Sequence, residues 1–168
     1  MDSENTVQQL AIRLGNRLRE QRLLITTAES CTGGMVASAI TDISGSSGWF
    51  ERGFVTYSNQ AKSEMIGVPA DMIEKHGAVS ESIAREMAEG ALRNSRAQLS
   101  LSITGIAGPG GGTPQKPVGT VCFAWSNRVH TLCQTRVFKG DRRQIRLQAS
   151  AHALRGVLTM LEENENEN

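Results

Sequence analysis

A chain of 168 residues, 39% hydrophobic and 21% charged, is long enough for one domain with a single core, and its composition is ordinary for a globular protein. A formal net charge of +1 gives no electrostatic reason to expect nucleic acid or an anionic membrane as a partner. The polar residues 1–5 lack the pattern of a signal peptide, and no apolar run approaches the roughly 20 residues of a membrane span, so the cytoplasm is the expected location.

The first part of the chain predicts alternating helices and strands. Apolar residues at helical spacing predict an amphipathic helix over 6–21, and the apolar, β-branched run 23–28 predicts a buried strand. A glycine-bearing turn then leads into a helix over 35–41. A flexible turn at 45–48 separates that helix from a strand predicted over 54–57.

The next part predicts three helices followed by three strands. The helices are expected over 60–66, from Pro69 to Gly77, and after a cap at Ser80. The strands are expected over 99–103, 118–125 and 129–138, and the loop 105–117 joins the first two. Five glycines and three prolines make this loop irregular, and long loops inside compact domains commonly carry function.

The last helix completes the expected fold. Asp141 is predicted to cap a long helix that ends near residue 161, and the alternating glutamates and asparagines of 162–168 predict a disordered tail. The order of helices and strands predicts an α/β fold, a three-layer α/β/α sandwich with a mixed β-sheet. We expect one domain over 1–161.

The residue types that commonly bind metals or form catalytic triads show no clear pattern in this chain. The three cysteines and three histidines lack the spacing of a zinc site, so we expect neither a metal nor a cofactor. Cys122 and Cys133 fall in strand-like runs, where buried free thiols are common. His76, His130 and His152 each suit a structural position better than a place in a Ser-His-Asp triad.

The segment T-A-E-S-C-T-G-G, Thr27–Gly34, gathers hydroxyl, thiol and glycine groups where the first predicted strand ends. Side chains in such a position rest on a rigid support and face the crevice beyond the sheet. Glycine lets backbone N–H groups approach a substrate closely, and the start of the following helix favours negative charge. Ser30 is therefore a candidate nucleophile, although a helix cap formed by Ser30 or Thr32 explains the same pattern.

A serine nucleophile needs a base, and Lys62 is the candidate. It follows Tyr57-Ser58-Asn59 at a predicted strand-to-helix junction, which is a second expected crevice position. Burial would lower the pKa of its amine toward the working pH. On spacing alone, a solvated surface lysine is the simpler interpretation.

The run G-I-A-G-P-G-G-G that begins at Gly105 has the glycine content of a dinucleotide-binding loop. It follows a predicted strand, but it leads across prolines into another strand and not into a helix. A Rossmann dinucleotide site is therefore rejected.

Longer motifs stand in order along the chain. After T-A-E-S-C-T-G-G come G-S-S-G-W-F-E-R-G-F-V-T-Y-S-N at 45–59, Lys62, H-G-A-V-S at 76–80, S-I-T-G-I-A-G-P at 102–109, K-P-V-G-T-V at 116–121 and G-D-R at 140–142. Together they resemble the CinA C-terminal domain family, and they closely resemble its stand-alone bacterial members, the nicotinamide mononucleotide deamidases. The resemblance covers about residues 7–160.

This resemblance implies hydrolysis of the carboxamide of nicotinamide mononucleotide to nicotinic acid mononucleotide and ammonia, in pyridine nucleotide recycling and without a cofactor. Ser30 would attack the amide carbon, and Lys62 would accept its proton and later protonate the departing ammonia. Tyr57 would orient this pair or donate a hydrogen bond to the oxyanion. Cys31 is a rival nucleophile, but neighbouring side chains point apart and only one of the two can face the substrate.

Further residues are expected to bind the substrate, including its phosphate. They are Cys31, Thr32, Gly33, Gly34, Ser46, Ser47, Thr104, Gly105, Ala107, Gly108, Arg142 and Arg146. Arg142 and Arg146 lie four residues apart at a helix start, where an arginine pair suits a phosphate, although solvated surface charge explains the spacing equally well. No nucleic acid or membrane partner is expected, and an apolar last helix with open sheet edges favours a homodimer.

Two other functions remain open at this point. A catalytically silent nucleotide-binding paralogue, with a regulatory or competence-linked role, would keep the same fold. The intact set of Ser30, Tyr57 and Lys62 argues against that alternative, because lost catalysis frees such residues to change. Hydrolysis of a different amide by the same residues is compatible with all of the motifs.

Overall fold

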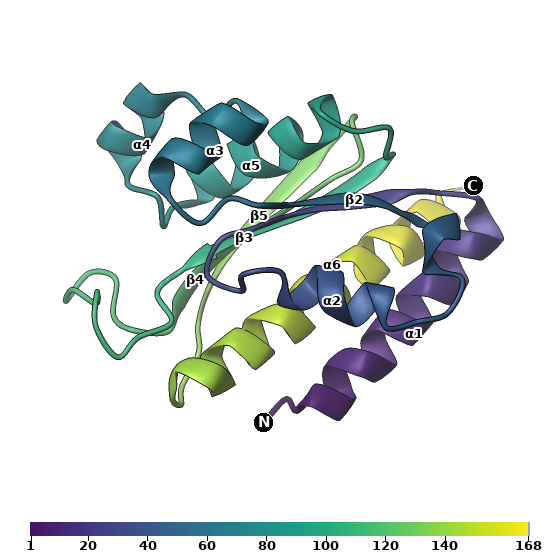
Figure 1. Cartoon of the computed structure of the whole chain (residues 1–168), viewed down its shortest axis with the longest axis horizontal. Coiled ribbons are helices and arrows are strands. Elements are labelled where there is room, and N and C mark those ends of the chain that lie inside the picture. Colours follow the sequence, from purple (N-terminus) through teal and green to yellow (C-terminus); the bar gives the residue numbers. More distant parts are fainter. Residues whose placement is uncertain (168) are drawn as a thin grey trace.

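A five-stranded mixed sheet lies between two layers of helices in the computed structural model, which describes residues 1–167 (Figure 1). The strands are β1 (Ile25–Glu29), β2 (Phe50–Val55), β3 (Leu99–Gly105), β4 (Thr120–Ser126) and β5 (Thr131–Val137), in the spatial order β2-β1-β3-β4-β5. Strand β1 pairs in parallel with β2 and β3, whereas β3 with β4 and β4 with β5 pair antiparallel. The predicted three-layer α/β/α sandwich with a mixed sheet is confirmed.

The helices divide between the two faces of the sheet (Figure 1). One face is covered by α1 (Glu4–Gln21), α2 (Met35–Thr41) and α6 (Arg142–Asn166), and the other by α3 (Asn59–Ile66), α4 (Ala70–His76) and α5 (Glu81–Arg93). Because helices pack on both faces, the central strands β1, β3 and β4 are buried along almost their whole length. Strands β2 and β5 form the edges and are more exposed.

The carboxyl ends of β1, β2 and β3 meet at one edge of the sheet, because these three strands run in parallel. Two backbone hydrogen bonds continue the pairing just beyond the strands. Thr56 N–H donates to the Glu29 carbonyl and Ser30 N–H donates to the Ile103 carbonyl, each at 2.9 Å. The first residues after β1 and β2 are therefore held rigidly side by side at this edge.

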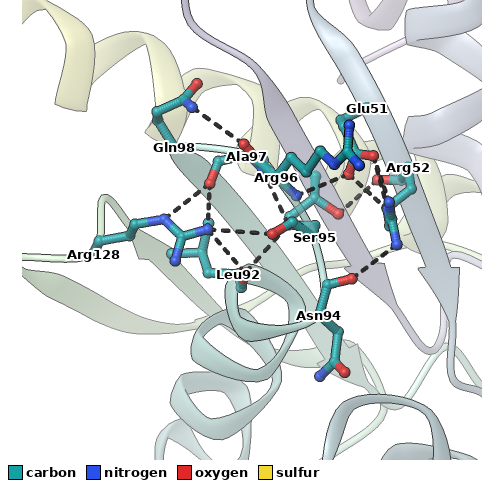
Figure 2. Close-up of polar contacts among 10 residues, drawn as sticks. Glu51, Arg52, Leu92, Asn94, Ser95, Arg96, Ala97, Gln98 and Arg128 are labelled. Atoms are coloured by element: carbon teal, nitrogen blue, oxygen red, sulfur yellow. Dashed lines mark hydrogen bonds and ion pairs between the residues drawn. The ribbon is translucent and has the colours of Figure 1, made fainter.

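At the other end of the strands, away from the carboxyl ends of β1, β2 and β3, a polar cluster connects the end of α5 to the sheet (Figure 2). The guanidinium of Arg128, in the turn between β4 and β5, donates to the carbonyls of Leu92, Ser95 and Ala97 at distances from 2.8 to 3.4 Å. Leu92 lies in the last turn of α5, where carbonyls lack partners within the helix, and Ser95 and Ala97 lie in the segment that leads from α5 to β3, so one arginine binds both. The cluster fixes the position of α5 over the sheet.

Strand β2 differs from its prediction. The sequence predicts a strand over 54–57, whereas β2 spans Phe50–Val55. The charged residues Glu51 and Arg52 break the apolar pattern by which a strand is predicted from sequence. An edge strand tolerates them because it can expose polar side chains on both faces. Gly53 also argues against a strand in the sequence, because glycine is uncommon inside strands. In the structure, a Cβ at Gly53 would lie 2.7 Å from the Thr27 hydroxyl of β1, so the close approach of the two strands requires glycine.

The C-terminal tail also differs from its prediction. A disordered segment was expected over 162–168, but α6 continues through Asn166. Glu165 accepts a hydrogen bond from the Gln21 side chain at 2.9 Å and forms an ion pair with Arg17, so α1 supports the extra turn. The expectation for residue 168 lies outside the described residues.

Candidate active site

Ser30 and Lys62 meet where β1 and β2 end. The Lys62 amine donates to the Ser30 hydroxyl with an Nζ–Oγ distance of 3.1 Å. Both groups also lie against the Tyr57 carbonyl oxygen, which accepts from Lys62 Nζ at 3.3 Å and from Ser30 Oγ at 3.4 Å. Ser58 caps α3 by accepting from the Ala61 N–H at 3.0 Å, which fixes the helix that carries Lys62. The arrangement is a serine held beside an amine.

Lys62 is one of the most deeply buried side chains, with 1% of its surface exposed. The simpler interpretation of the sequence, a solvated surface lysine, is therefore wrong. Burial disfavours the charged ammonium and lowers the pKa of the amine below its ordinary value, although the neighbouring Cys31 opposes part of this change. A larger fraction of neutral amine gives Lys62 the property that a general base needs.

Cys31 is buried directly after Ser30, and its thiol is a poor nucleophile in this position. Burial, with a smaller contribution from the charge of Glu29, raises the pKa of the Cys31 thiol to about 12. Since the thiolate is the reactive form, almost none would be present near neutral pH.

A cavity of about 330 Å³ opens in front of Ser30 and Lys62. Nine of the fifteen site residues expected from the sequence line it: Ser30, Cys31, Tyr57, Lys62, Thr104, Gly105, Ala107, Gly108 and Arg142. The cavity is also lined by six residues that were not expected at the site from the sequence, namely Asn59, Ala78, Val79, Ile106, Gly110 and Gly111. The glycine-rich loop after β3 therefore forms one wall of the cavity.

Tyr57 contributes differently from what the sequence suggests. Tyr57 is 60% exposed, and its phenol oxygen accepts from Arg142 Nη2 at 3.1 Å. Arg142 Nη1 donates to the Gly108 carbonyl at 2.8 Å, so this arginine joins Tyr57 to the glycine-rich loop. The part of Tyr57 that contacts Ser30 and Lys62 is its main-chain carbonyl.

Four expected substrate-binding residues lie behind the nucleophile turn and not in its cavity. Gly33, Gly34 and Arg146 line a separate cavity of about 450 Å³. Arg146 is occupied structurally, since it donates to the carbonyls of Cys31 and Thr32, each at 3.1 Å. The Thr32 side chain is fully buried and donates to the Glu29 carboxylate at 2.6 Å. These four residues therefore do not line the cavity of Ser30 in this chain.

Ser46 and Ser47 also lie away from the cavity of Ser30. They lie in η1 (Ser46–Gly48), a short 3₁₀ turn that precedes β2. The Trp49 carbonyl, directly after this turn, accepts from the N–H of Ile25, the first residue of β1. Both serines are therefore at the amino end of the parallel strands, across the sheet from Ser30, and they do not line the cavity of this chain.

Lys116 is a functional candidate that spacing does not reveal. Its amine donates to the carbonyl of Val79 at 2.5 Å and to that of His76 at 3.4 Å. Thr104 donates to the neighbouring Ala78 carbonyl at 2.9 Å. The motifs at 76–80 and 116–121 are both evident in the sequence. Only the fold shows that Lys116 of the second motif binds the first, two residues of which, Ala78 and Val79, line the cavity.

The described residues offer no alternative chemistry based on a clustered metal site. Within residues 1–167, no group of three or more His, Cys, Asp or Glu side chains could hold a metal ion. None of the described helices has both the length and the apolar character needed to cross a membrane.

Comparisons with known proteins agree with the fold and with the order of the motifs. The family model of the CinA C-terminal domain matches residues 7–161. The nicotinamide-nucleotide amidohydrolase PncC of Escherichia coli (strain K12) is 53% identical over 90% of this chain and 93% of its own length, and the PncC of Pseudomonas putida is 47% identical over 90% and 94%. Among solved structures, the competence/damage inducible protein CihA from Agrobacterium tumefaciens superposes with a TM-score of 0.89 at 44% identity, covering 94% of this chain and 96% of that one.

Proposed function

This chain belongs to the CinA C-terminal domain family, and from that premise we propose that it is an amidohydrolase that converts nicotinamide mononucleotide to nicotinic acid mononucleotide and ammonia. The observation that carries the proposal is the contact between the Ser30 hydroxyl and the buried Lys62 amine, 3.1 Å apart at the base of a cavity. Hydrolysis of an unactivated amide requires a nucleophile, a proton carrier and donors for the oxyanion. The cavity offers a candidate for each.

In the first half of the reaction, neutral Lys62 accepts the Ser30 proton as Oγ attacks the carboxamide carbon. The carbonyl oxygen becomes an oxyanion, which needs preorganised hydrogen-bond donors. The Ser30 N–H already donates to Ile103, whereas the N–H of Cys31, a residue that lines the cavity, donates to no other residue in the described part of the chain. We assign this N–H to the oxyanion, where one donor is typically worth about 3 kcal/mol.

In the second half, the Lys62 ammonium passes its proton to the departing nitrogen, and ammonia leaves as the C–N bond breaks. The product of this step is an ester between the Ser30 oxygen and the nicotinoyl group. Water then attacks the ester carbon while Lys62 accepts one water proton and returns it to the Ser30 oxygen, and the product leaves as a carboxylic acid that loses its remaining proton to solvent. One lysine serves as base and acid in turn, and the enzyme ends in its starting state.

Arg142 is our proposed anchor for the phosphate. It is the arginine that lines the cavity, and it stands next to the glycine-rich loop. Replacing it, Arg142→Gln, is expected to raise KM for nicotinamide mononucleotide about tenfold or more, because a charge-assisted hydrogen bond contributes about 1.5–3 kcal/mol. The effect on kcat should be small, since the phosphate is remote from the amide.

Steady-state kinetics of the variant on nicotinamide mononucleotide and on the riboside without phosphate test this assignment. Arg143→Gln is a matched control, because Arg143 is the next residue on α6, pairs with Glu4 and lines the other cavity. The control should leave KM within about twofold. Equal losses on the riboside and on the nucleotide would contradict a phosphate contact.

The substrate itself is tested by incubating the purified protein with nicotinamide mononucleotide in the presence of a chelator. We expect equal amounts of ammonia and nicotinic acid mononucleotide, with the riboside turned over at least about tenfold less efficiently. No product, together with calorimetric binding of the nucleotide, would favour the silent paralogue. Neither product nor binding, but hydrolysis of another carboxamide, would favour the third alternative.

The remaining expectations are coarser. A deamidase of this kind would act in pyridine nucleotide recycling, and we propose a cytoplasmic location for it. We also propose a homodimer, because β5 is an open sheet edge on which Leu132 and Val137 are more than half exposed.

A further inference from the structure

Glu29 is a buried carboxylate directly before the nucleophile. It is the last residue of β1, none of its surface is exposed, and the proposed reaction gives it no role. Oε1 accepts from the Thr32 hydroxyl at 2.6 Å and from the Val36 N–H at 3.0 Å, and Oε2 accepts from the Ala37 N–H at 3.0 Å. A carboxylate with three donors and no contact to solvent is an arrangement that the fold maintains for a reason.

These contacts close the turn that carries Ser30. The main chain leaves β1 at Glu29, passes through 30–34 and enters α2, and the Glu29 side chain binds the first turn of that helix. The carboxylate thus fixes both ends of a five-residue segment. Gly33 and Gly34 adopt positive φ angles of 57° and 98° in this segment, which allow the tight path but add no rigidity of their own.

Closure of the turn also determines what the start of α2 can do. The sequence suggests that this helix start could bind an oxyanion or a phosphate. Two of its N–H groups, those of Val36 and Ala37, are already occupied by the chain's own carboxylate. The Glu29 carboxylate therefore occupies the position that a substrate anion would need at this helix start. Gly33 and Gly34 accordingly do not line the cavity of Ser30.

We propose that Glu29 is a positioning residue for the hydrolysis, which holds Ser30 Oγ and the Cys31 N–H in the geometry that attack and oxyanion binding need. The inference rests on the proposed function, since it explains how that reaction is aligned. Glu29 acts through the turn and does not contact the substrate. Misplacement of a reacting group by about 1 Å can cost roughly 100-fold in rate.

Glu29→Gln is the first test. Glutamine keeps one acceptor oxygen, but its NH₂ group must face at least one of the three donors, so the turn shifts. We expect kcat to fall roughly 30-fold while KM stays within about threefold, because alignment is lost and binding is not. Thr32→Val should lower kcat in the same direction and less strongly, and Thr32→Ser, which keeps the hydroxyl, should restore it.

A second measurement follows Ser30 without the substrate. The rate at which a sulfonyl fluoride labels Ser30, read by mass spectrometry, should fall at least about tenfold in Glu29→Gln. Ser100→Ala is the matched stability control, because it removes a buried hydrogen bond of 2.7 Å to the Ala88 carbonyl at the far end of β3. It should lower the melting temperature and leave both kcat and the labelling rate unchanged.

The outcomes separate the two proposals. Wild-type kcat and labelling in Glu29→Gln, or losses no larger than in Ser100→Ala, would overturn the positioning role. If the wild-type protein deamidates nothing, the proposed function fails, and the labelling rates alone decide whether Glu29 aligns Ser30. A labelling rate that is lower in Glu29→Gln and normal in Ser100→Ala supports the inference in either case.

Discussion

Ser30→Ala is expected to lower kcat for nicotinamide mononucleotide by about 10⁴-fold or more, which corresponds to roughly 5.5 kcal/mol of lost transition-state stabilisation. The methyl group cannot form the ester, and no other group near Lys62 is ready to replace it. Binding should persist, because the other cavity residues are unchanged, so KM or the dissociation constant should move little. Purified variants assayed for ammonia and nicotinic acid mononucleotide provide the measurement.

Cys31→Ala is the informative companion to this variant. It keeps the backbone N–H that we assign to the oxyanion and removes only the thiol, whose raised pKa of about 12 makes it unreactive near neutral pH. Most of the activity should therefore remain. The opposite result, an active Ser30→Ala and an inactive Cys31→Ala, would make Cys31 the nucleophile and leave Lys62 to activate a thiol.

The sequence predicts the position of Ser30 well because the information is local. A buried strand, a turn with glycines and a helix follow one another within 23–41, and together they place a hydroxyl at the sheet edge. Lys62 is different, since its burial depends on distant residues. At Gly90 of α5 a Cβ would lie 2.1 Å from the Ile66 carbonyl of α3, so the helix of Lys62 is seated through a contact 24 residues away.

Other expected binding residues lie away from the cavity of Ser30 for a related reason. A turn between two glycines, such as 45–48, looks suitable for a phosphate whichever edge of the sheet it occupies. Its edge is set by strand order and direction, which composition does not encode. Similarly, the spacing of four between Arg142 and Arg146 predicts a shared face of α6. It does not predict that Arg142 lines the cavity of Ser30 while Arg146 lines the other cavity and donates to the Cys31 carbonyl.

Lys62→Met should remove the base while preserving the fold. We expect kcat/KM to fall about 10³-fold, within the range that a general acid–base group contributes. The double variant with Ser30→Ala should be no less active than Ser30→Ala alone, because the two residues act as one unit. Lys75→Met is the matched control, since Lys75 is an exposed lysine on α4 and its loss should change nothing.

The pH dependence follows from the lowered pKa of Lys62. In the wild-type protein kcat/KM should rise with pH as the amine loses its proton, and should level off below the ordinary lysine value of 10.5. The same shift sets the sign of the stability effect. The Lys62 amine binds its proton more tightly in the unfolded chain than in the folded one. Below the pKa of the folded state, the buried ammonium therefore lowers the free energy of unfolding by its full amount. This loss of stability disappears as the pH rises toward 10.5.

Methionine carries no such penalty, so Lys62→Met should melt at the same temperature as the wild type or higher near neutral pH, and the difference should shrink at alkaline pH. Thermal melts from pH 6 to pH 10, run beside the kinetic profiles, test both consequences of one buried amine. A variant that is inactive and also much less stable would mean that Lys62 holds the fold through its hydrogen bonds. A stable, inactive variant whose wild-type parent follows the predicted pH profile identifies Lys62 as the base that activates Ser30.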